Sequence, residues 1–543
     1  MAVSSAPPDL SDSVRYDDVP DAVHDRRWIT LGVLCLSLLI IVMDNTILNV
    51  AIPSLVHELG ASNSELQWII DSYTLVFAGL LLTAGSLGDR FGRKRALRLG
   101  IVIFGVGSVL SALSGSAGHL IFTRSLMGIG GALIMPSTLS ILTNVFRNPR
   151  ERARAIAVWA GFSGLAVAIG PIIGGVLLAH FSWSSVFWVN IPIGIGAVVL
   201  GHFFVPESKD PSAPKIDVPG AFMSIFGLGG ILFGIIEGPS VGWSDPTVLA
   251  AFAIGLGLLG GFIAWERHTP TPMLDMSFFK NRRFTAANIS ITLTFFALFG
   301  SMFLLTQYWQ FVHGYSALQA GVRLLPFAAV MMVTAPSSAR IVERAGTKAV
   351  VTTGLLVVAA ALLGLSFITS DSSYLRVIAN YCVMAVGMGL VMAPATESVM
   401  GSLPREKAGV GSAVNDTTRQ VGGALGVAVI GSIVASVYSA DINKAASSAG
   451  LSGTALEQSR ESLGGALQTA NSLGANAATF AQEAKDSFVT ALSSGLRLGA
   501  ATMVVAATVA YFFLPARAHV AAPELRPEAD LPAIDGYDPA IVD

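Results

Sequence analysis

The sequence predicts an all-α integral membrane protein with fourteen transmembrane helices, and three observations lead to this fold class. Charged residues make up only 13% of the 543 residues, whereas hydrophobic residues make up 53%. Soluble domains carry about 25% charged residues, so much of this surface is expected to face lipid. Long apolar runs recur along the chain, and the segments between them are alternately rich and poor in basic residues. Lipid offers no partner to backbone polar groups, so these runs are expected to be helices.

Each expected span is a run of about 20 mostly apolar residues, the length that crosses the hydrocarbon core. The runs lie near 29–51, 65–86, 97–115, 119–143, 153–179, 186–205, 218–237, 247–265, 284–311, 318–338, 349–369, 373–399, 408–436 and 489–514. They lack the alternation of membrane barrel strands.

Basic residues give these helices an orientation, because Lys and Arg collect in cytoplasmic loops. With the N-terminus inside, 25 of the 33 Lys and Arg residues fall in inner segments, 3 in the outer loop 437–488, and the remaining 5 within spans. A missed or surplus span would reverse every later loop, so the charges support the span count independently. We therefore expect a multi-pass protein of the cell (inner) membrane with both termini in the cytoplasm.

The expected organisation has two six-helix bundles separated by two extra helices. The segments are a cytoplasmic tail (1–27), an N-terminal six-helix bundle (28–205), a linker with two extra transmembrane helices (206–283), a C-terminal six-helix bundle with the outer loop 437–488 (284–514), and a cytoplasmic tail (515–543). The acid, Arg, Gly and Lys of Gly85–Lys94 recur in Ala339–Lys348, 254 residues later. Such repeats are typical of secondary transporters. The outer loop is expected to be partly amphipathic helix at the membrane surface, or disordered.

Five motifs, in order, resemble those of the major facilitator superfamily. Gly85–Lys94 is similar to its signature loop after the second helix, Leu120–Gly128 to its fourth-helix motif, and Gly161–Gly175 to the fifth-helix motif of antiporters. Met43–Pro53 and Ser182–Gly194 resemble the fourteen-span drug:proton antiporters of the EmrB/QacA type. The resemblance covers about 28–514, and it implies the major facilitator fold and export coupled to proton entry.

The loop Gly85–Lys94 also has a direct physical interpretation. Its glycines allow helices to approach closely, and Asp89 lies at a helix junction, where it can pair with Arg93 or face a helix N-terminus. By resemblance the loop is a latch that favours the outward-facing state, formed by Gly85, Asp89, Arg90, Gly92 and Arg93. The alternative is an ordinary positive-inside loop.

The fifth-helix motif combines small residues with a proline. The expected residues are Gly161, Gly164, Gly170, Pro171, Gly174 and Gly175. Proline removes a backbone donor and favours a kink, and glycines let helices slide closely past one another. The alternative is glycine-mediated packing without a role in the transport cycle.

Ionisable residues within spans are the main functional candidates, because charge in a bilayer is costly. Asp44, Asp71 and Arg124 lie at similar depths from the outer ends of their spans. We expect Asp44 to carry the proton, Arg124 to be its partner, and Asp71 to modulate coupling or contact a substrate cation. The alternatives are a static ion pair for Asp44 and a position near water for Asp71.

A second candidate set lies in the thirteenth span. Asp416 and Arg419 are three residues apart, so they share a helix face and can pair. They are expected to serve protonation or cation recognition, and the alternative is a self-neutralised structural pair.

Aromatic and amide side chains in the second and ninth spans are candidates to line a substrate cavity, since aromatic faces attract lipophilic cations. They are Trp68, Tyr73, Phe296, Phe299, Phe303 and Gln307. The alternative places them against lipid or in packing contacts.

The function expected is proton-coupled efflux of lipophilic, often cationic compounds by alternating access. No G-x-x-x-x-G-K-[ST] motif occurs, so the proton gradient rather than ATP is the expected energy source, and no cofactor or metal is expected. No serine-elbow or H-E-x-x-H motif occurs, so an enzyme is not expected. The net charge of -2 argues against nucleic acid. A monomer is expected, with small lipophilic substrates or lipids, protons and the bilayer as partners. The alternatives are a lipid or lipid-precursor exporter on the same fold, and uptake.

Overall fold

The computed structural model describes residues 25–59, 63–210, 217–270 and 272–516. This part of the chain contains 14 helices long and apolar enough to cross a membrane, which confirms the predicted fold class and span count. The N-terminal helices are α2 (Arg27–Leu59), α3 (Asn63–Phe91), α4 (Arg93–Ala112), α5 (Ala117–Val145), α6 (Pro149–His180), α7 (Ser185–Trp188) and α8 (Asn190–Phe204). The extra helices are α9 (Val218–Val241) and α10 (Pro246–His268). The C-terminal helices are η1 (Met276–Lys280), α11 (Arg282–Gln307), η2 (Tyr308–Val312), α12 (Ala317–Arg323), α13 (Leu325–Ala345), α14 (Thr347–Leu365), α15 (Tyr374–Met400), η3 (Arg405–Lys407), α16 (Ala408–Ser448), α17 (Gly453–Glu461), α18 (Leu463–Ala470), η4 (Gly474–Asn476) and α19 (Ala477–Phe513).

Buried side chains form two separate clusters. One consists mainly of residues from α2 to α8, and the other mainly of residues from α11 to α19. Four residues of the C-terminal helices belong to the first cluster, namely Ala339, Ala393, Met400 and Ala408. They show where the second set of helices packs on the first.

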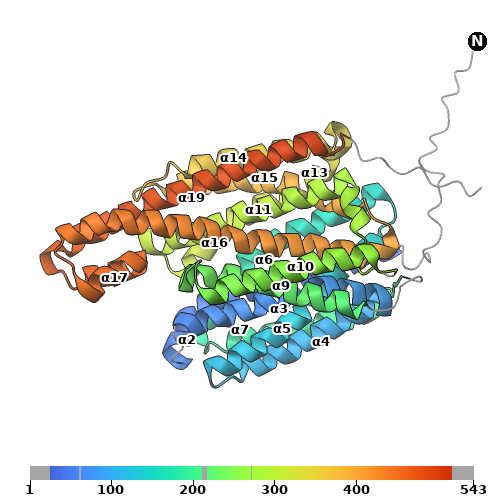
Figure 1. Cartoon of the computed structure of the whole chain (residues 1–543), viewed down its shortest axis with the longest axis horizontal. Coiled ribbons are helices and arrows are strands. Elements are labelled where there is room, and N and C mark those ends of the chain that lie inside the picture. The colour runs from blue at the N-terminus through green and yellow to red at the C-terminus, as the bar shows by residue number, and fades with distance from the viewer. Residues whose placement is uncertain (1–24, 60–62, 211–216, 271, 517–543) are drawn as a thin grey trace, which may run out of the picture.

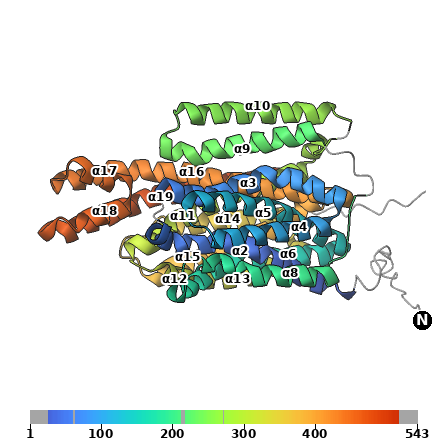
Figure 2. The ribbon, with the colours of Figure 1, turned by 90° about the horizontal axis from the view of Figure 1, so that it is seen from below.

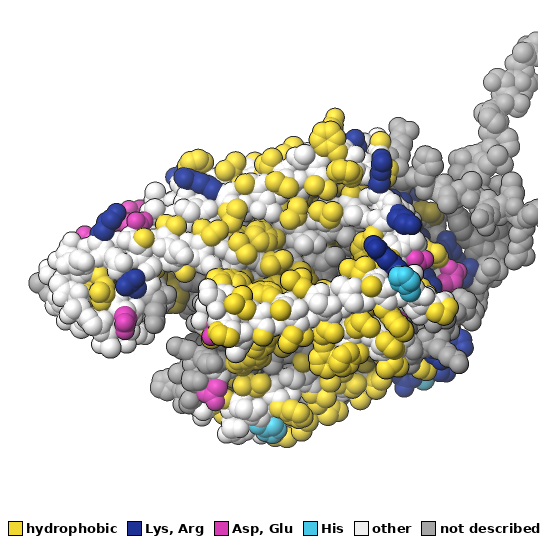
Figure 3. Space-filling model, viewed as in Figure 1, with side chains coloured by type: hydrophobic (Ala, Val, Ile, Leu, Met, Phe, Trp, Pro, Cys, Tyr) yellow, Lys and Arg dark blue, Asp and Glu magenta, His cyan; other side chains and the backbone are white. Residues whose placement is uncertain are grey.

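The two extra helices form a hairpin on one side of the bundle (Figure 2). α9 packs on α3 and α16, whereas α10 packs mainly on α9. The hairpin therefore adds a layer outside the helices that carry the candidate site. Hydrophobic side chains cover much of the face seen in Figure 3, as expected of a surface in contact with lipid.

The repeat seen in the sequence has a structural counterpart. Gly92 precedes α4 with φ of 112°, and Gly346 precedes α14 with φ of 82°. Only glycine adopts these values at little cost, so both turns need it. We call the end of the bundle with these two turns the inner end, because the charge distribution predicts that it faces the cytoplasm.

The outer loop 437–488 contains helix, as the first of the two expectations has it, and more helix than expected. α16 continues to Ser448 and α19 begins at Ala477, so both helices run past the bundle, with α17 and α18 between them (Figure 1). Tyr438, Ile442, Phe480, Ala484 and Phe488 are buried in the same hydrophobic cluster. This apolar stripe stabilises the projecting helices, and it was hidden by the Ala- and Ser-rich composition.

Candidate functional site

A buried ion pair joins α2 and α5. Arg124 donates through Nη1 to Oδ2 of Asp44, and the side chains of Arg124 and Asp44 are 0% and 1% exposed. Arg124 Nε also donates to the carbonyl of Ile69 at 3.2 Å, and its guanidinium lies 4.5 Å from the centroid of the Tyr73 ring. The structure thus brings together two of the three residues that the sequence placed at one depth, Asp44 and Arg124. A charge pair withdrawn from water in this way is costly unless its hydrogen bonds are satisfied.

The other carboxylate oxygen of Asp44 has a partner that sequence reasoning missed. Asn190, at the start of α8, donates through Nδ2 to Asp44 Oδ1 at 3.1 Å and to Ser108 Oγ at 3.2 Å. In the sequence analysis Asn190 appears only within the family motif Ser182–Gly194. An amide two residues before a proline, inside an apolar run, was the available signal.

Asp71 lies on α3 and is half-buried. Its neighbour Ser72 donates to the carbonyl of Ile121 on α5 at 3.2 Å, so this turn of α3 is attached to the helix of Arg124. A modulating role for Asp71 stays a prediction.

Asp416 and Arg419 are both buried on α16, but they do not form the direct ion pair expected from their spacing. Asp416 accepts from Asn415 Nδ2 at 3.2 Å and from Ser412 Oγ at 3.4 Å. Arg419 Nη2 instead donates to Thr396 Oγ1 at 2.9 Å. Its guanidinium also lies 5.3 Å from the ring centroids of both Trp159 and Phe295, and these contacts from α6 and α11 direct the side chain away from Asp416.

The predicted cavity residues lie in different settings. Trp68 is half-buried and packs on Phe233 of α9, with ring centroids 5.8 Å apart. Tyr73 is buried under Arg124. On α11, Phe296 and Gln307 are half-buried, whereas Phe299 and Phe303 are exposed. On α11, the ring that contacts a buried cation is Phe295, which the sequence did not single out.

The glycines of α6 contact two different neighbours. Gly170 and Gly174 face α2, where added Cβ atoms would meet Thr46 and Ile47. Gly164 and Gly175 face the other half, at Met331 of α13 and Leu318 of α12, and Gly161 lies near Met332. Pro171 contacts Gly321 of α12. α6 therefore lies between the helix of Asp44 and the C-terminal half.

Gly170→Ala is expected to impair export and to destabilise the protein by about 1–3 kcal/mol, the usual range for overpacking. The new methyl group would overlap Thr46 Oγ1, which is held by the carbonyls of Val42 and Met43, so α2 must move next to Asp44. Thermal unfolding and transport measure the effect. Gly161→Ala is the matched control, because its nearest neighbour is at 3.5 Å. Equal effects at both positions would contradict this explanation.

At the inner end, Asp89 connects the two halves. Its carboxylate accepts from the backbone amides of Gly409 at 2.9 Å and Val410 at 3.1 Å, which are the first free N–H groups of α16. Arg93 pairs with Asp89 at 2.6 Å and donates to the carbonyl of Glu406 at 2.8 Å. A Cβ at Gly85 would lie 2.6 Å from the carbonyl oxygen of Gly409, so glycine is needed for this close approach.

The other predicted latch residues lie beside this contact. Arg90 is half-buried, with its guanidinium 5.5 Å from the Phe91 ring centroid. At Gly92, a Cβ would lie 2.6 Å from Glu207 Oε1, in addition to the unfavourable φ. Glu207 accepts from the amide of Lys94 at 3.1 Å, so it caps the start of α4.

Further ion pairs cross between the halves at the inner end. Arg152 pairs with Glu397 at 2.8 Å, and Arg154 with Glu343 at 3.7 Å. Lys407 pairs with Asp210 of the linker at 3.3 Å. The inner ends of the two halves are therefore in contact in this conformation.

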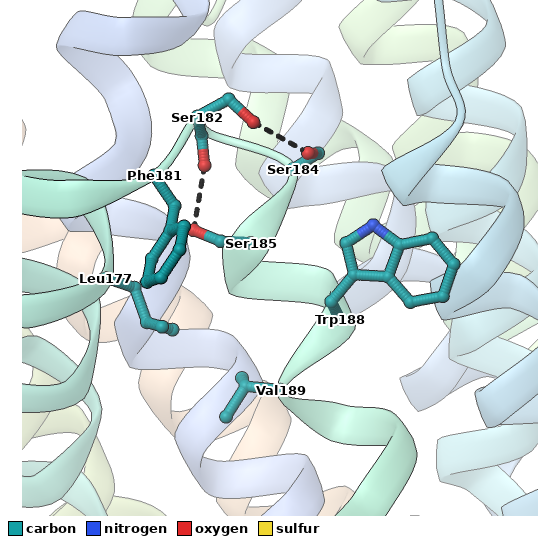
Figure 4. Close-up of a pocket in the computed structure, with 7 residues that line it drawn as sticks. All are labelled: Leu177, Phe181, Ser182, Ser184, Ser185, Trp188 and Val189. Carbon is teal, nitrogen blue, oxygen red and sulfur yellow. Dashed lines mark hydrogen bonds between the residues drawn. The ribbon is translucent and has the colours of Figure 1, made fainter.

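A surface groove lies at the outer corner between the end of α6 and α7 (Figure 4). It is lined by Leu177, Phe181, Ser182, Ser184, Ser185, Trp188 and Val189. The Ser185 hydroxyl donates to the carbonyl of Ser182 at 2.7 Å, which closes the turn before α7. Phe181 is 66% and Trp188 45% exposed, as is common for aromatic residues at a membrane interface.

Comparison with known proteins shows the family of the chain. The model of the Major Facilitator Superfamily matches residues 34–427. The chain is 36% identical to the multidrug efflux pump LfrA of Mycolicibacterium smegmatis, over 89% of this chain and 94% of that protein. It is 33% identical to the tetracenomycin C resistance and export protein of Streptomyces glaucescens, over 92% and 94%. It is 34% identical to the methyl viologen resistance protein SmvA of Salmonella typhimurium, over 82% and 90%.

A solved structure supports the same fold. The human organic anion transporter MFSD10 has a TM-score of 0.57 to this chain at 15% identity, covering 88% of this chain and 99% of that one. The chain therefore belongs to the Major Facilitator Superfamily, and within it to the fourteen-span drug:proton antiporters that its motifs resemble.

Proposed function

We propose that this protein exports lipophilic, often cationic compounds across the cell membrane in exchange for protons. The observation that carries the proposal is the buried Asp44–Arg124 pair, because a buried carboxylate beside a cation is a site where a single proton changes the local charge. Proton entry from the outer side neutralises Asp44 and weakens its attraction to Arg124. The proton gradient is the energy source, and no cofactor takes part.

Alternating access follows from how the halves meet. In this conformation the inner end is held by Asp89, Arg93 and the start of α16. Release of these contacts would let the halves rock apart on that side, with α6 sliding between α2 and α13. We assign Asp71 a modulating role near the proton site. The protein is proposed to act as a monomer in the cell (inner) membrane, with both termini in the cytoplasm.

The substrate class is supported by the aromatic surroundings of Arg419. Its guanidinium lies against Trp159 and Phe295, which are surfaces that a lipophilic cation would also bind. Asp416 on the same helix adds a carboxylate. The names of the relatives, which include a multidrug efflux pump and a methyl viologen resistance protein, favour drug export over lipid export.

Everted membrane vesicles test the proposal, because their lumen corresponds to the outside of the cell. An acidic lumen should drive accumulation of tetraphenylphosphonium, measured with an ion-selective electrode, and collapse of the pH gradient should release it. Vesicles without the protein are the control. Accumulation that requires ATP, or that persists without a pH gradient, would overturn the proposal.

A further inference from the structure

Asn190, near the outer end of the sixth span, contributes its side-chain amide to the proton site. The helix breaks between α7 and α8, and Pro192 lacks the N–H that would bond to the carbonyl of Trp188. Asn190 starts α8 and is 1% exposed. Its Nδ2 donates to Asp44 and to Ser108, and Ser108 in turn donates to the carbonyl of Phe187 at 2.8 Å. A continuous series of hydrogen bonds therefore runs from the Asp44 carboxylate to the backbone of α7.

The two oxygens of Asp44 have chemically different partners. Oδ2 faces the Arg124 cation from α5, whereas Oδ1 faces the neutral amide from α8. Tyr73 from α3 packs on the guanidinium, and Ser108 from α4 lies behind the amide. Asn190 Oδ1 is also buried, and it has no hydrogen-bond partner in the described structure. A buried hydrogen-bond acceptor without a partner lowers the stability of the folded protein. This oxygen belongs to the same amide group that already donates to Asp44.

We infer that Asn190 is a positioning residue whose side-chain amide changes its hydrogen bonds with the protonation state of Asp44. This inference rests on the proposed role of Asp44 as proton carrier. The ionised carboxylate accepts from Nδ2. When a proton from the outer side binds Oδ1, the new O–H needs an acceptor, and rotation of the amide supplies Asn190 Oδ1. No covalent bond of Asn190 changes. The rotation breaks the hydrogen bond from Nδ2 to Ser108 Oγ. A change in the protonation of Asp44 therefore alters the hydrogen bonding at the junction of α7 and α8.

The test measures how accumulation of tetraphenylphosphonium in everted vesicles depends on lumenal pH. Asn190→Leu keeps most of the volume, and Asn190→Ala is a second variant in case the first does not fold. Each variant removes the donor to the ionised carboxylate and the acceptor for the protonated form. The bond to the charged form is the stronger of the two, so its loss favours the protonated form. We expect the half-maximal pH to move upward by about one unit, the size of one hydrogen bond to a charged group.

The matched control is Ser111→Ala, also on α4. It removes a buried hydrogen bond to Thr123 at 2.8 Å and a weak contact with Met127 Sδ at 3.5 Å, but no contact with Asn190 or Asp44, and it should leave the half-maximal pH unchanged. An unchanged midpoint in both Asn190 variants, or an equal shift in Ser111→Ala, would overturn the inference. Asp44→Asn separates the two proposals. If it retains coupled accumulation, the proposed function fails, and if it loses coupling while the Asn190 variants keep the wild-type midpoint, only this inference fails.

Discussion

Asp44→Asn is expected to abolish accumulation of tetraphenylphosphonium driven by a pH gradient. The amide preserves size but cannot take up and release the proton, and a positioned proton-transfer group typically contributes 10²–10⁴-fold to a rate, so a loss of at least about a hundredfold is expected. Downhill movement of substrate should persist, because the halves can still rock. Vesicles with and without an imposed gradient measure the two activities separately.

The stability of this variant must be measured alongside transport. Removing one charge of a buried ion pair costs up to about 3–5 kcal/mol, because the amide oxygen of the variant offers Arg124 a neutral acceptor in place of the carboxylate. Asp71→Asn is the comparison, since it removes a half-buried carboxylate from the neighbouring α3, and the modulating role proposed for Asp71 predicts that uphill export is weakened but not abolished. Uphill export by Asp44→Asn at the wild-type rate would refute the assignment of Asp44 as proton carrier.

Asp89→Asn is expected to lower export by at least about tenfold, which corresponds to about 1.4 kcal/mol. The change removes the charge that pairs with Arg93, a side chain only 1% exposed, and one of the two acceptors at the start of α16. The inner end should then open more often. A cysteine in place of Ala339, which is buried against the N-terminal cluster, should react faster with a maleimide in this variant.

Glu343→Gln provides the matched control for Asp89→Asn, because Glu343 is the equivalent acid in the second repeat. Its pair with Arg154 spans 3.7 Å, and both side chains are more than a third exposed, so it contributes at most about 1 kcal/mol. Little change in transport or labelling is expected. Equal effects of the two substitutions would show that the latch depends on charge at the inner end in general, and not on the contact between Asp89 and α16.

Some features of the site followed from local sequence, and others did not. The depth of Asp44 and Arg124 followed from counting residues to the ends of two apolar runs, since a helix rises a fixed distance per residue. The contact of Asp89 with Gly409, 320 residues away, had no local signal. The spacing of Asp416 and Arg419 predicted a pair, but spacing fixes only a shared face, and aromatic rings from α6 and α11 decide where the guanidinium lies.

By itself, the sequence determined the fourteen spans and the family and predicted an orientation from charge, because apolar length, charge and motifs are properties of short segments. Only the tertiary structure decided which polar groups share a buried site. Asn190 donates a hydrogen bond to Asp44, and Trp68 packs on Phe233 of α9. The outer segment 437–488 forms helices that project from the bundle. The physical reason is that a polar group within a bilayer must find its partner on another helix, and that choice depends on how helices rotate and pack against one another.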